Sequence, residues 1–185
     1  MNQLGTNGGD REPPSRTDSA LEGAAPFAPD LLRRRSPTHL PVADYHNRSI
    51  IVFVTVCTQG RKPLLAHAEA VETIRQAWAK AHIWRIGRWV VMPDHVHLFC
   101  APGTWPPEPI ARWVSFWKSE ASRRWPRAEE QPIWQRDFWD TQLRPGDDYR
   151  AKWQYVRENP VRAGLCADPE TWPFQGEENP LMWTE

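Results

Sequence analysis

Apolar runs broken by polar turns predict three strands in the middle of the chain. The stretch 49–58 (SIIVFVTVCT) is β-branched and apolar at successive positions, which is typical of a central strand buried on both faces. Residues 83–93 (IWRIGRWVVMP) predict a second strand, and residues 95–101 (HVHLFCA) predict a third. Pro93-Asp94 predicts a tight turn, so the second and third strands should form a hairpin.

Two other stretches carry apolar residues at helical spacing, three to four positions apart. In residues 68–82 the apolar positions form one face of a helix: Val71, Ile74, Trp78 and Ala81. In residues 107–125 a longer stripe predicts a second helix: Ile110, Trp113, Val114, Trp117 and Ala121. Both helices need an apolar surface to cover their stripes, so we expect them to pack on the predicted sheet.

The last third of the chain predicts a weaker strand region and a third helix. Residues 132–144 are interpreted as short strands or irregular structure. Asp147 or Asp148 can cap a helix that continues to about Asn159, where Pro160 follows. The order of elements, β-α-β-β-α-(β)-α, predicts an α+β fold. We expect an antiparallel sheet with helices packed on it, a ferredoxin-like sandwich.

Composition divides the 185 residues into three parts. Residues 1–40 are rich in Pro, Gly, Ser and Asp without apolar periodicity, so we expect a flexible N-terminal tail. Residues 41–165 should form the folded domain, and residues 166–185 an acidic C-terminal tail without Lys or Arg. The 23 basic and 23 acidic residues cancel, but residues 36–165 keep 18 basic against 13 acidic, a net charge of +5 (18 − 13). This excess is compatible with a polyanionic partner.

The cysteines, the length of the apolar runs and the tryptophans further restrict the class of protein to which the chain can belong. Three cysteines without a CxxC spacing suggest neither a zinc ribbon nor a disulfide framework. No apolar run reaches membrane-spanning length and the N-terminus has no signal-like apolar stretch, so we expect a soluble, cytoplasmic protein without a membrane partner. Most of the twelve tryptophans should build the core, although flat aromatics also stack on unpaired bases.

The six histidines include one close pair, His95 and His97, in the predicted third strand. Alternate residues of a strand point to the same face, so both imidazoles should project together while Val96 and Leu98 point to the other side. Two imidazoles at this spacing can share a metal ion, but the ion needs further ligands. The alternative is an exposed strand that carries two histidines without a metal.

Helical geometry separates two tyrosines in the third predicted helix. At about 100° per residue, Tyr149 falls on the apolar stripe of this helix, whereas Tyr155 lies on its polar face. Asn159 lies one turn after Tyr155 on the same face. A tyrosine beside an amide on a polar face is consistent with catalysis, and equally with a surface tyrosine that is hydrogen-bonded to a neighbour.

Two separated motifs, VVMPDHVHLF (90–99) and WQYVRENPVRAGL (153–165), resemble the single-tyrosine transposases of the His-hydrophobic-His endonuclease superfamily. FWDTQLRPGDDY (138–149) fits the same pattern. The ending NPVRAGL is similar to the branch of REP-associated tyrosine transposases more than to the insertion-sequence enzymes. The resemblance covers about residues 40–176.

This resemblance implies a metal-dependent DNA transposase and endonuclease. His95 and His97 would bind a divalent metal, Mg²⁺ or Mn²⁺, and Asn159 would supply a third ligand. Asparagine departs from the glutamine that is usual in the insertion-sequence branch, but it matches the REP branch. Tyr155 would attack a phosphate of single-stranded DNA and leave a 5′-phosphotyrosine and a free 3′-hydroxyl. Lys152, one turn before Tyr155, could favour the phenolate or neutralise the phosphate.

For the REP branch, the resemblance also implies a DNA hairpin substrate with a short single-stranded guide beside it. Candidate DNA contacts are the basic residues Arg33, Arg34, Arg35, Arg112, Lys118, Arg123, Arg124 and Lys152. The triplet 33–35 is interpreted either as a solvated charge run or as an arm that grips DNA. Such a protein would act on the nucleoid in the cytoplasm, as a monomer or a homodimer.

Two other interpretations stay open. The chain could be a domesticated protein of the same fold that binds DNA hairpins without cutting them. It could also be a metal-independent α+β domain in which the histidine pair has no role. The presence together of His95, His97, Tyr155 and Asn159 favours the enzyme, because a non-catalytic relic has no need to retain all four.

Overall fold

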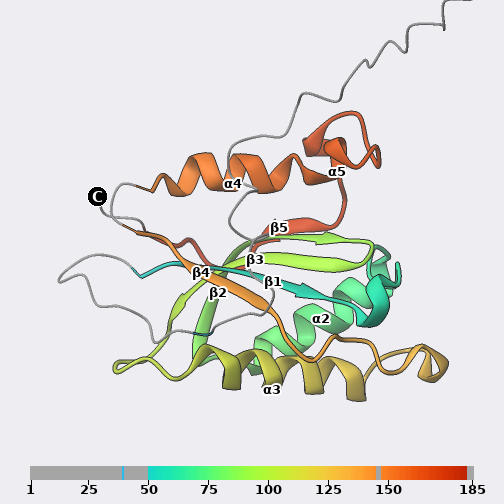
Figure 1. Ribbon diagram of the computed structural model, residues 1–185, viewed down its shortest axis with the longest axis horizontal. Coiled ribbons are helices and arrows are strands. Elements are labelled where there is room, and N and C mark those ends of the chain that lie inside the picture. The colour runs from blue at the N-terminus through green and yellow to red at the C-terminus, as the bar shows by residue number, and fades with distance from the viewer. Residues whose placement is uncertain (1–38, 40–49, 145–146, 183–185) are drawn as a thin grey trace, which may run out of the picture. The chain divides into compact units, whose positions relative to one another are not determined.

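The computed structural model describes residues 39, 50–144 and 147–182, all within one compact unit, residues 35–185. Figure 1 shows a sheet with helices on both of its faces. In chain order the elements are β1 (Val52–Cys57), η1 (Gln59–Arg61), α2 (Ala68–Lys80), β2 (Trp84–Met92), β3 (His95–Pro102), α3 (Ile110–Arg123), η2 (Ala128–Glu130), β4 (Trp139–Gln142), α4 (Tyr149–Arg157), α5 (Asn159–Arg162), η3 (Pro169–Thr171) and β5 (Gln175–Glu177). The strands pair antiparallel in the order β4-β1-β3-β2-β5.

The first four strands and the two helices between them have the order and connectivity of a ferredoxin-like sandwich, β1-α2-β2-β3-α3-β4 with β3 between β1 and β2. The predicted α+β fold is therefore confirmed. The helices divide between the two faces of the sheet, with α2 and α3 on one face and α4 and α5 on the other (Figure 1). Within the described ranges, no helix is long and apolar enough to span a bilayer.

The alternation of β1 and β3 assigns their side chains to these two faces. Val54, Val96 and Leu98 belong to the hydrophobic core with α2 and α3. The opposite face carries Phe53 and Phe99, whose rings lie 5.0 Å apart. α4 packs on this second face, because the rings of Tyr149 and Trp153 both contact Phe99 edge to face.

Tryptophan side chains fill most of the layer between the sheet and α2 and α3. Of the eleven tryptophans in the described part of the chain, eight are buried: Trp78, Trp84, Trp89, Trp113, Trp117, Trp125, Trp134 and Trp172. All of these except Trp172 belong to this core. They meet at the steep angles that aromatic rings prefer, as between Trp78 and Trp117, whose ring centroids lie 6.1 Å apart. The expected core role of the tryptophans is confirmed.

The predicted ends of the first three strands and the first two helices agree with the structure to within three residues. Asp148 caps α4, and its carboxylate accepts hydrogen bonds from the N–H groups of Arg150 and Ala151. α4 ends at Arg157, within two residues of the predicted end at Asn159, and a short further helix, α5, follows it without having been predicted. Pro160 has no N–H to donate to the preceding turn, which explains why one continuous helix does not form.

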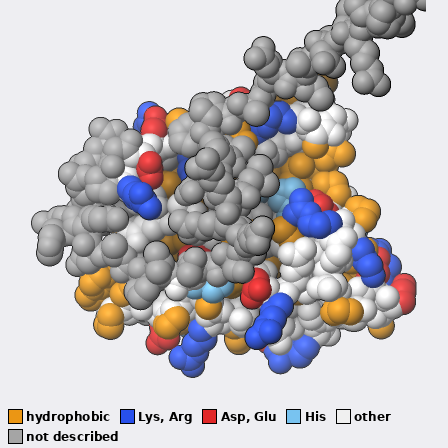
Figure 2. Space-filling view, in the orientation of Figure 1, with side chains coloured by type: hydrophobic (Ala, Val, Ile, Leu, Met, Phe, Trp, Pro, Cys, Tyr) orange, Lys and Arg blue, Asp and Glu red, His pale blue; other side chains and the backbone are white. Residues whose placement is uncertain are grey.

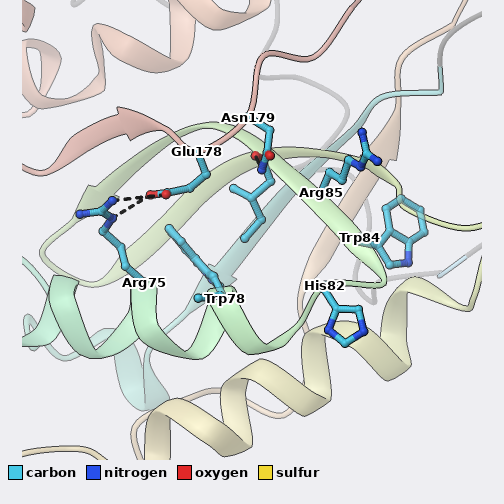
Figure 3. Close-up of a pocket in the computed structure, with 9 residues that line it drawn as sticks. Arg75, Trp78, His82, Trp84, Arg85, Glu178 and Asn179 are labelled. Carbon is cyan, nitrogen blue, oxygen red and sulfur yellow. Dashed lines mark hydrogen bonds and ion pairs between the residues drawn. The ribbon is translucent and has the colours of Figure 1, made fainter.

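The stretch 166–185 is more than an acidic tail, because residues 175–177 form β5 on the edge of β2. Glu178 follows this strand and binds Arg75 of α2 through its carboxylate, at 2.7 Å from Nε (Figure 3). The same carboxylate accepts a hydrogen bond from Trp89 Nε1 at 3.2 Å. Earlier in the stretch, Glu170 forms an ion pair with Arg157 of α4. The acidic residues of the C-terminal stretch therefore bind basic residues of the domain.

β2 contains a bulge that the pattern did not predict. Its pairing with β3 shifts between Ile86 and Trp89, so three steps along β2 face two steps along β3. Ile86 and Trp89 consequently both reach the core with α2 and α3. Arg88, between them, places its guanidinium 5.6 Å from the ring centroid of Tyr149 on the opposite face.

Replacing Trp113 by alanine should lower the free energy of unfolding by about 3–5 kcal/mol. The indole is fully buried, and its N–H donates a 2.7 Å hydrogen bond to Ala81 O, so the variant loses packing and leaves a carbonyl without its donor. Phe116→Ala on the same helix is the matched control, because that ring is 46% exposed and should cost less than about 1 kcal/mol. Urea unfolding followed by circular dichroism measures both. Equal losses would contradict this account of the core.

Candidate active site

His95 and His97 project from β3 to the sheet face on which α4 packs. Their Nε2 atoms lie 3.0 Å apart, and the two rings meet almost at right angles. His97 also stacks on Phe53 of β1, with ring centroids 5.4 Å apart. Val96 and Leu98 lie in the opposite core, as the alternation of the strand predicts. The two imidazoles therefore share one face of the sheet, with their Nε2 atoms next to each other.

The other ring nitrogen of each histidine is bound within the protein. His95 Nδ1 lies 2.6 Å from Asp94 Oδ1, and His97 Nδ1 lies 2.8 Å from Thr55 Oγ1 on the neighbouring strand. The second oxygen of Asp94 pairs with Arg61 Nε at 2.7 Å. Such partners fix the orientation of an imidazole and leave Nε2 for a ligand, as in the outer shells of metal sites.

One arrangement of protons satisfies this chain of hydrogen bonds. The Thr55 hydroxyl donates to His97 Nδ1, His97 Nε2–H donates to His95 Nε2, and His95 Nδ1–H donates to Asp94. To offer both Nε2 lone pairs to a metal, His97 must move its proton from Nε2 to Nδ1. Thr55 allows this change without a broken contact, because a hydroxyl can accept as well as donate.

Both imidazoles are held in the neutral form that binds metals. Burial lowers the pKa of His95, although the Asp94 carboxylate opposes this effect. Burial lowers the pKa of His97 well below its ordinary value, and the charges of His95, Arg61 and Arg162 lower it further.

The donor set fits a divalent metal only in part. The two Nε2 atoms lie 3.0 Å apart because they share a hydrogen bond, and both become lone-pair donors once the His97 proton moves to Nδ1. Imidazole nitrogen is a ligand for Mn²⁺ or Zn²⁺, whereas Mg²⁺ prefers oxygen. Among the described residues, no group of three or more His, Cys, Asp and Glu side chains could hold an ion. The remaining ligands must then be amide, water or phosphate oxygens.

α4 and α5 present the other predicted site residues. Tyr149 is buried against Phe99, and burial raises its pKa to about 12, as befits the core residue that helical phase predicted. Tyr155, on the other side of α4, is half-buried. Asn159 opens α5, and its Oδ1 accepts a hydrogen bond from Arg162 Nη2. The Arg162 guanidinium lies over the Tyr155 ring, with Cζ 4.1 Å from the centroid.

A known protein family matches the part of the chain that contains the histidine pair. The family described as "Transposase IS200 like" matches residues 47–144, just over half of the chain. The chain belongs to this family. The match contains the histidine pair and β1 to β4, and it ends before α4, so Tyr155 and Asn159 lie outside it.

Individual proteins that are similar to this chain include REP-associated tyrosine transposases. The REP-associated tyrosine transposase of Escherichia coli is 29% identical over 125 residues, which are 66% of this chain and 73% of that protein. A Haemophilus influenzae protein described in the same terms is 27% identical over 96 residues, 45% of this chain and 53% of its own length. A solved REP-associated tyrosine transposase bound to a REP hairpin has a TM-score of 0.59 and 26% identity, covering 72% of this chain and 79% of that chain. The resemblance to the REP-associated branch is confirmed.

Lys152 of this IS200-like transposase lies between α4 and the sheet. Its ammonium is 5.3 Å from the ring centroid of Phe53, the residue on which His97 stacks. Burial lowers the pKa of Lys152. The Lys152 side chain therefore lies on the same sheet face as the histidine pair. The sequence predicted only its position one turn before Tyr155.

The structure gives Lys118 a structural role in place of the DNA contact that the sequence predicted. Lys118 is buried, and its ammonium donates hydrogen bonds to the carbonyls of Gln135 and Arg136, at 2.6 and 2.9 Å. A cation held by two carbonyls under a loop has a structural role and is not presented to a phosphate. Its spacing already indicated this position, because Lys118 lies four residues after Val114 and three before Ala121, at the edge of the apolar stripe.

The other predicted DNA contacts do not gather at the histidine pair. Arg112, Arg123 and Arg124 are exposed on α3, which covers the opposite face of the sheet, and the first two form ion pairs with Glu108 and Glu120. On the face seen in Figure 2, the coloured Lys and Arg side chains alternate with Asp and Glu. Arg33, Arg34 and Arg35 lie outside the described residues.

Sequence reasoning missed Thr55, Asp94 and Arg162. Asp94 directly precedes the histidine pair, and a carboxylate at that place was a usable signal. Thr55 stands out as a hydroxyl in an otherwise apolar strand, but only the register of β1 and β3 shows that it faces His97. Arg162 follows Asn159 by three residues, a spacing at which side chains meet on a helix.

Acidification should destabilise the metal-free protein through the histidine pair. The pKa of each imidazole is lowered in the folded state, so between the unfolded value near 6.5 and the lower folded values the unfolded chain binds more protons. The free energy of unfolding should therefore fall as the pH drops below 6.5, by up to about 1.4 kcal/mol per pH unit for one imidazole. Urea titrations in chelator at several pH values measure this slope. His97→Gln should flatten it and the exposed His82→Gln should not; an unchanged slope in His97→Gln would contradict the assignment.

Replacing Lys118 by methionine should lower stability and leave DNA affinity unchanged. The two carbonyls lose their shared donor, which should cost about 1–3 kcal/mol in urea unfolding. Affinity for a DNA hairpin at fixed salt should stay within about twofold of the parent. Lys80→Met, at an exposed position of α2 that is not among the predicted DNA contacts, is the control for charge loss. A weaker hairpin complex with unchanged stability would restore Lys118 as a DNA contact.

Proposed function

We propose that this IS200-like transposase cleaves and rejoins single-stranded DNA beside a hairpin. Tyr155 acts as the nucleophile, and His95, His97 and Asn159 hold a divalent metal, Mg²⁺ or Mn²⁺. The histidine pair carries the proposal, because two neutral imidazoles bring their Nε2 atoms side by side on one sheet face while Thr55 and Asp94 hold the opposite nitrogens.

The class of DNA is supported by the relatives. The solved relative with a TM-score of 0.59 is a REP-associated tyrosine transposase bound to a REP hairpin. By analogy, the substrate of this chain is a hairpin with a flanking single-stranded guide, met in the cytoplasm on the nucleoid. The protein acts as a monomer or a homodimer, and no membrane takes part.

The chemistry assigns one role to each group. The Tyr155 phenol loses its proton and its oxygen forms a bond to phosphorus, while the bond from phosphorus to the 3′ oxygen breaks and that oxygen takes up a proton. A bound metal would supply charge neutralisation at the non-bridging phosphate oxygens. Lys152, on the same sheet face, adds positive charge that stabilises the phenolate or the phosphate. The phosphotyrosine keeps the energy of the broken bond, so the DNA end can be rejoined without a further energy source.

A second candidate function is hairpin binding without cleavage. One observation favours it: the Asn159 oxygen is already bound by Arg162. If this contact persists on DNA, the third ligand is missing and the fold serves only to bind.

A covalent adduct between DNA and Tyr155 is the expected outcome, and it distinguishes DNA cleavage from hairpin binding without cleavage. A panel of DNA hairpins with single-stranded flanks and a 3′ label is incubated with the protein and Mn²⁺, and the products are resolved on a denaturing gel. The parent should carry label, because the downstream fragment stays attached through its 5′ phosphate. Tyr155→Phe should lose at least about 10³-fold of the adduct while it binds the hairpin as tightly as the parent.

Tyr149→Phe is the matched control. The same hydroxyl is removed from the same helix, but at a buried position where it has no hydrogen-bond partner among the described residues. The adduct should form at the parent rate. Label that persists on Tyr155→Phe would assign the nucleophile elsewhere. Tight hairpin binding by the parent without any adduct across the panel would establish the second candidate instead.

A further inference from the structure

Arg162 contacts both of the groups that α4 and α5 bring to the proposed reaction. Its Nη2 donates to the side-chain oxygen of Asn159 and to the backbone carbonyl of Tyr155. Its guanidinium lies over the Tyr155 ring at 4.1 Å from the centroid. Glu158 completes the surroundings with an ion pair at 3.4 Å.

Helix capping explains only part of these contacts. α4 ends at Arg157, so the Tyr155 carbonyl is among the last ones of the helix, which lack an intrahelical donor. A basic side chain near a helix end often binds such a carbonyl. Capping does not require the guanidinium to bind the Asn159 amide as well, or to lie over a half-buried phenol ring.

Two cations would compete for the side-chain oxygen of Asn159: the divalent metal and the Arg162 guanidinium. This oxygen is the atom that would bind a hard divalent metal, and it is held by a group that carries a permanent positive charge. An amide oxygen has two lone pairs, but a metal and a guanidinium placed on both of them repel each other. The guanidinium and the ion therefore compete at this oxygen.

We propose that Arg162 is a positioning residue that holds the Tyr155 ring and the Asn159 amide in the metal-free protein and competes with the divalent metal for Asn159 Oδ1. The proposal rests on the proposed function, since it assigns Asn159 to the metal. Once the amide turns to the ion, the freed N–H groups of the guanidinium are available to a DNA phosphate, an anion whose geometry they match. Arg162 thereby couples metal binding to substrate binding.

The test measures metal affinity apart from activity. Mn²⁺ is titrated into the chelator-treated, DNA-free protein and followed by electron paramagnetic resonance. Arg162→Gln should bind Mn²⁺ roughly five- to tenfold more tightly than the parent, because the competing charge is gone. The same variant should form the Tyr155 adduct at least about tenfold more slowly at saturating Mn²⁺, because the ring and the amide are no longer positioned. Opposite changes in affinity and rate are not expected of a helix cap.

Three variants control the test. Arg157→Gln removes a cation of α4 that pairs with Glu170, and it should change neither quantity. In an Asn159→Ala background, Arg162→Gln should no longer tighten Mn²⁺ binding, because the contested oxygen is absent. Arg162→Lys keeps the positive charge and can still bind the last carbonyls of α4, but it lacks the planar set of N–H donors of a guanidinium. It should therefore tighten Mn²⁺ binding less than Arg162→Gln does. It should slow adduct formation as much as Arg162→Gln does. Arg162→Lys also keeps the test available if Arg162→Gln does not fold.

Unchanged or weaker Mn²⁺ affinity in both Arg162 variants would overturn the proposal and leave Arg162 as a helix cap. Absence of Mn²⁺ binding in the parent and in every variant would overturn it as well. Failure of the proposed function has a different signature: a parent that forms no adduct on any hairpin, whatever its affinity for Mn²⁺. Tighter Mn²⁺ binding in Arg162→Gln would still support the competition in that case.

Discussion

The pairing of β3 with β1 is the constraint on which the rest of the structure depends, because it divides the side chains of β3 between two helical layers. Val96 and Leu98 complete the tryptophan-rich core, while His95 and His97 face the side that α4 covers. A slip by one residue would turn both imidazoles into the apolar core, which has no partners for their nitrogens. The burial that stabilises the sheet therefore also holds the histidine pair in place.

The segment from α4 into α5 brings three other polar groups together. Asn159 and Arg162 lie three residues apart in α5, so their side chains meet on one face of that helix. The Arg162 guanidinium also lies over the ring of Tyr155, seven residues earlier in the chain.

Features set by neighbours along the chain could be predicted from the sequence. Alternation placed the two histidines on one face, and helical phase separated Tyr149 from Tyr155 before any motif was considered. Features set by distant residues could not be predicted. Thr55 precedes His97 by 42 residues, and Lys118 is buried only because a loop 17 residues later closes over its ammonium. β5 is three residues long and has no apolar alternation, so it forms only because the edge of β2 is there to pair with it.

The bulge in β2 also determines at which position this strand can lose a residue without a change in the faces of its side chains. Between Ile86 and Trp89, β2 has one more residue than the pairing with β3 requires. Loss of Gly87 would leave Ile86, Arg88 and Trp89 on the faces they now occupy, with a regular ladder in place of the bulge. Loss of a residue elsewhere in the paired part of β2 would invert every side chain beyond it. Residue 87 is therefore a point in β2 where the loss of a residue can be absorbed, at the expense of the hydrogen bond from Glu178 N to Gly87 O.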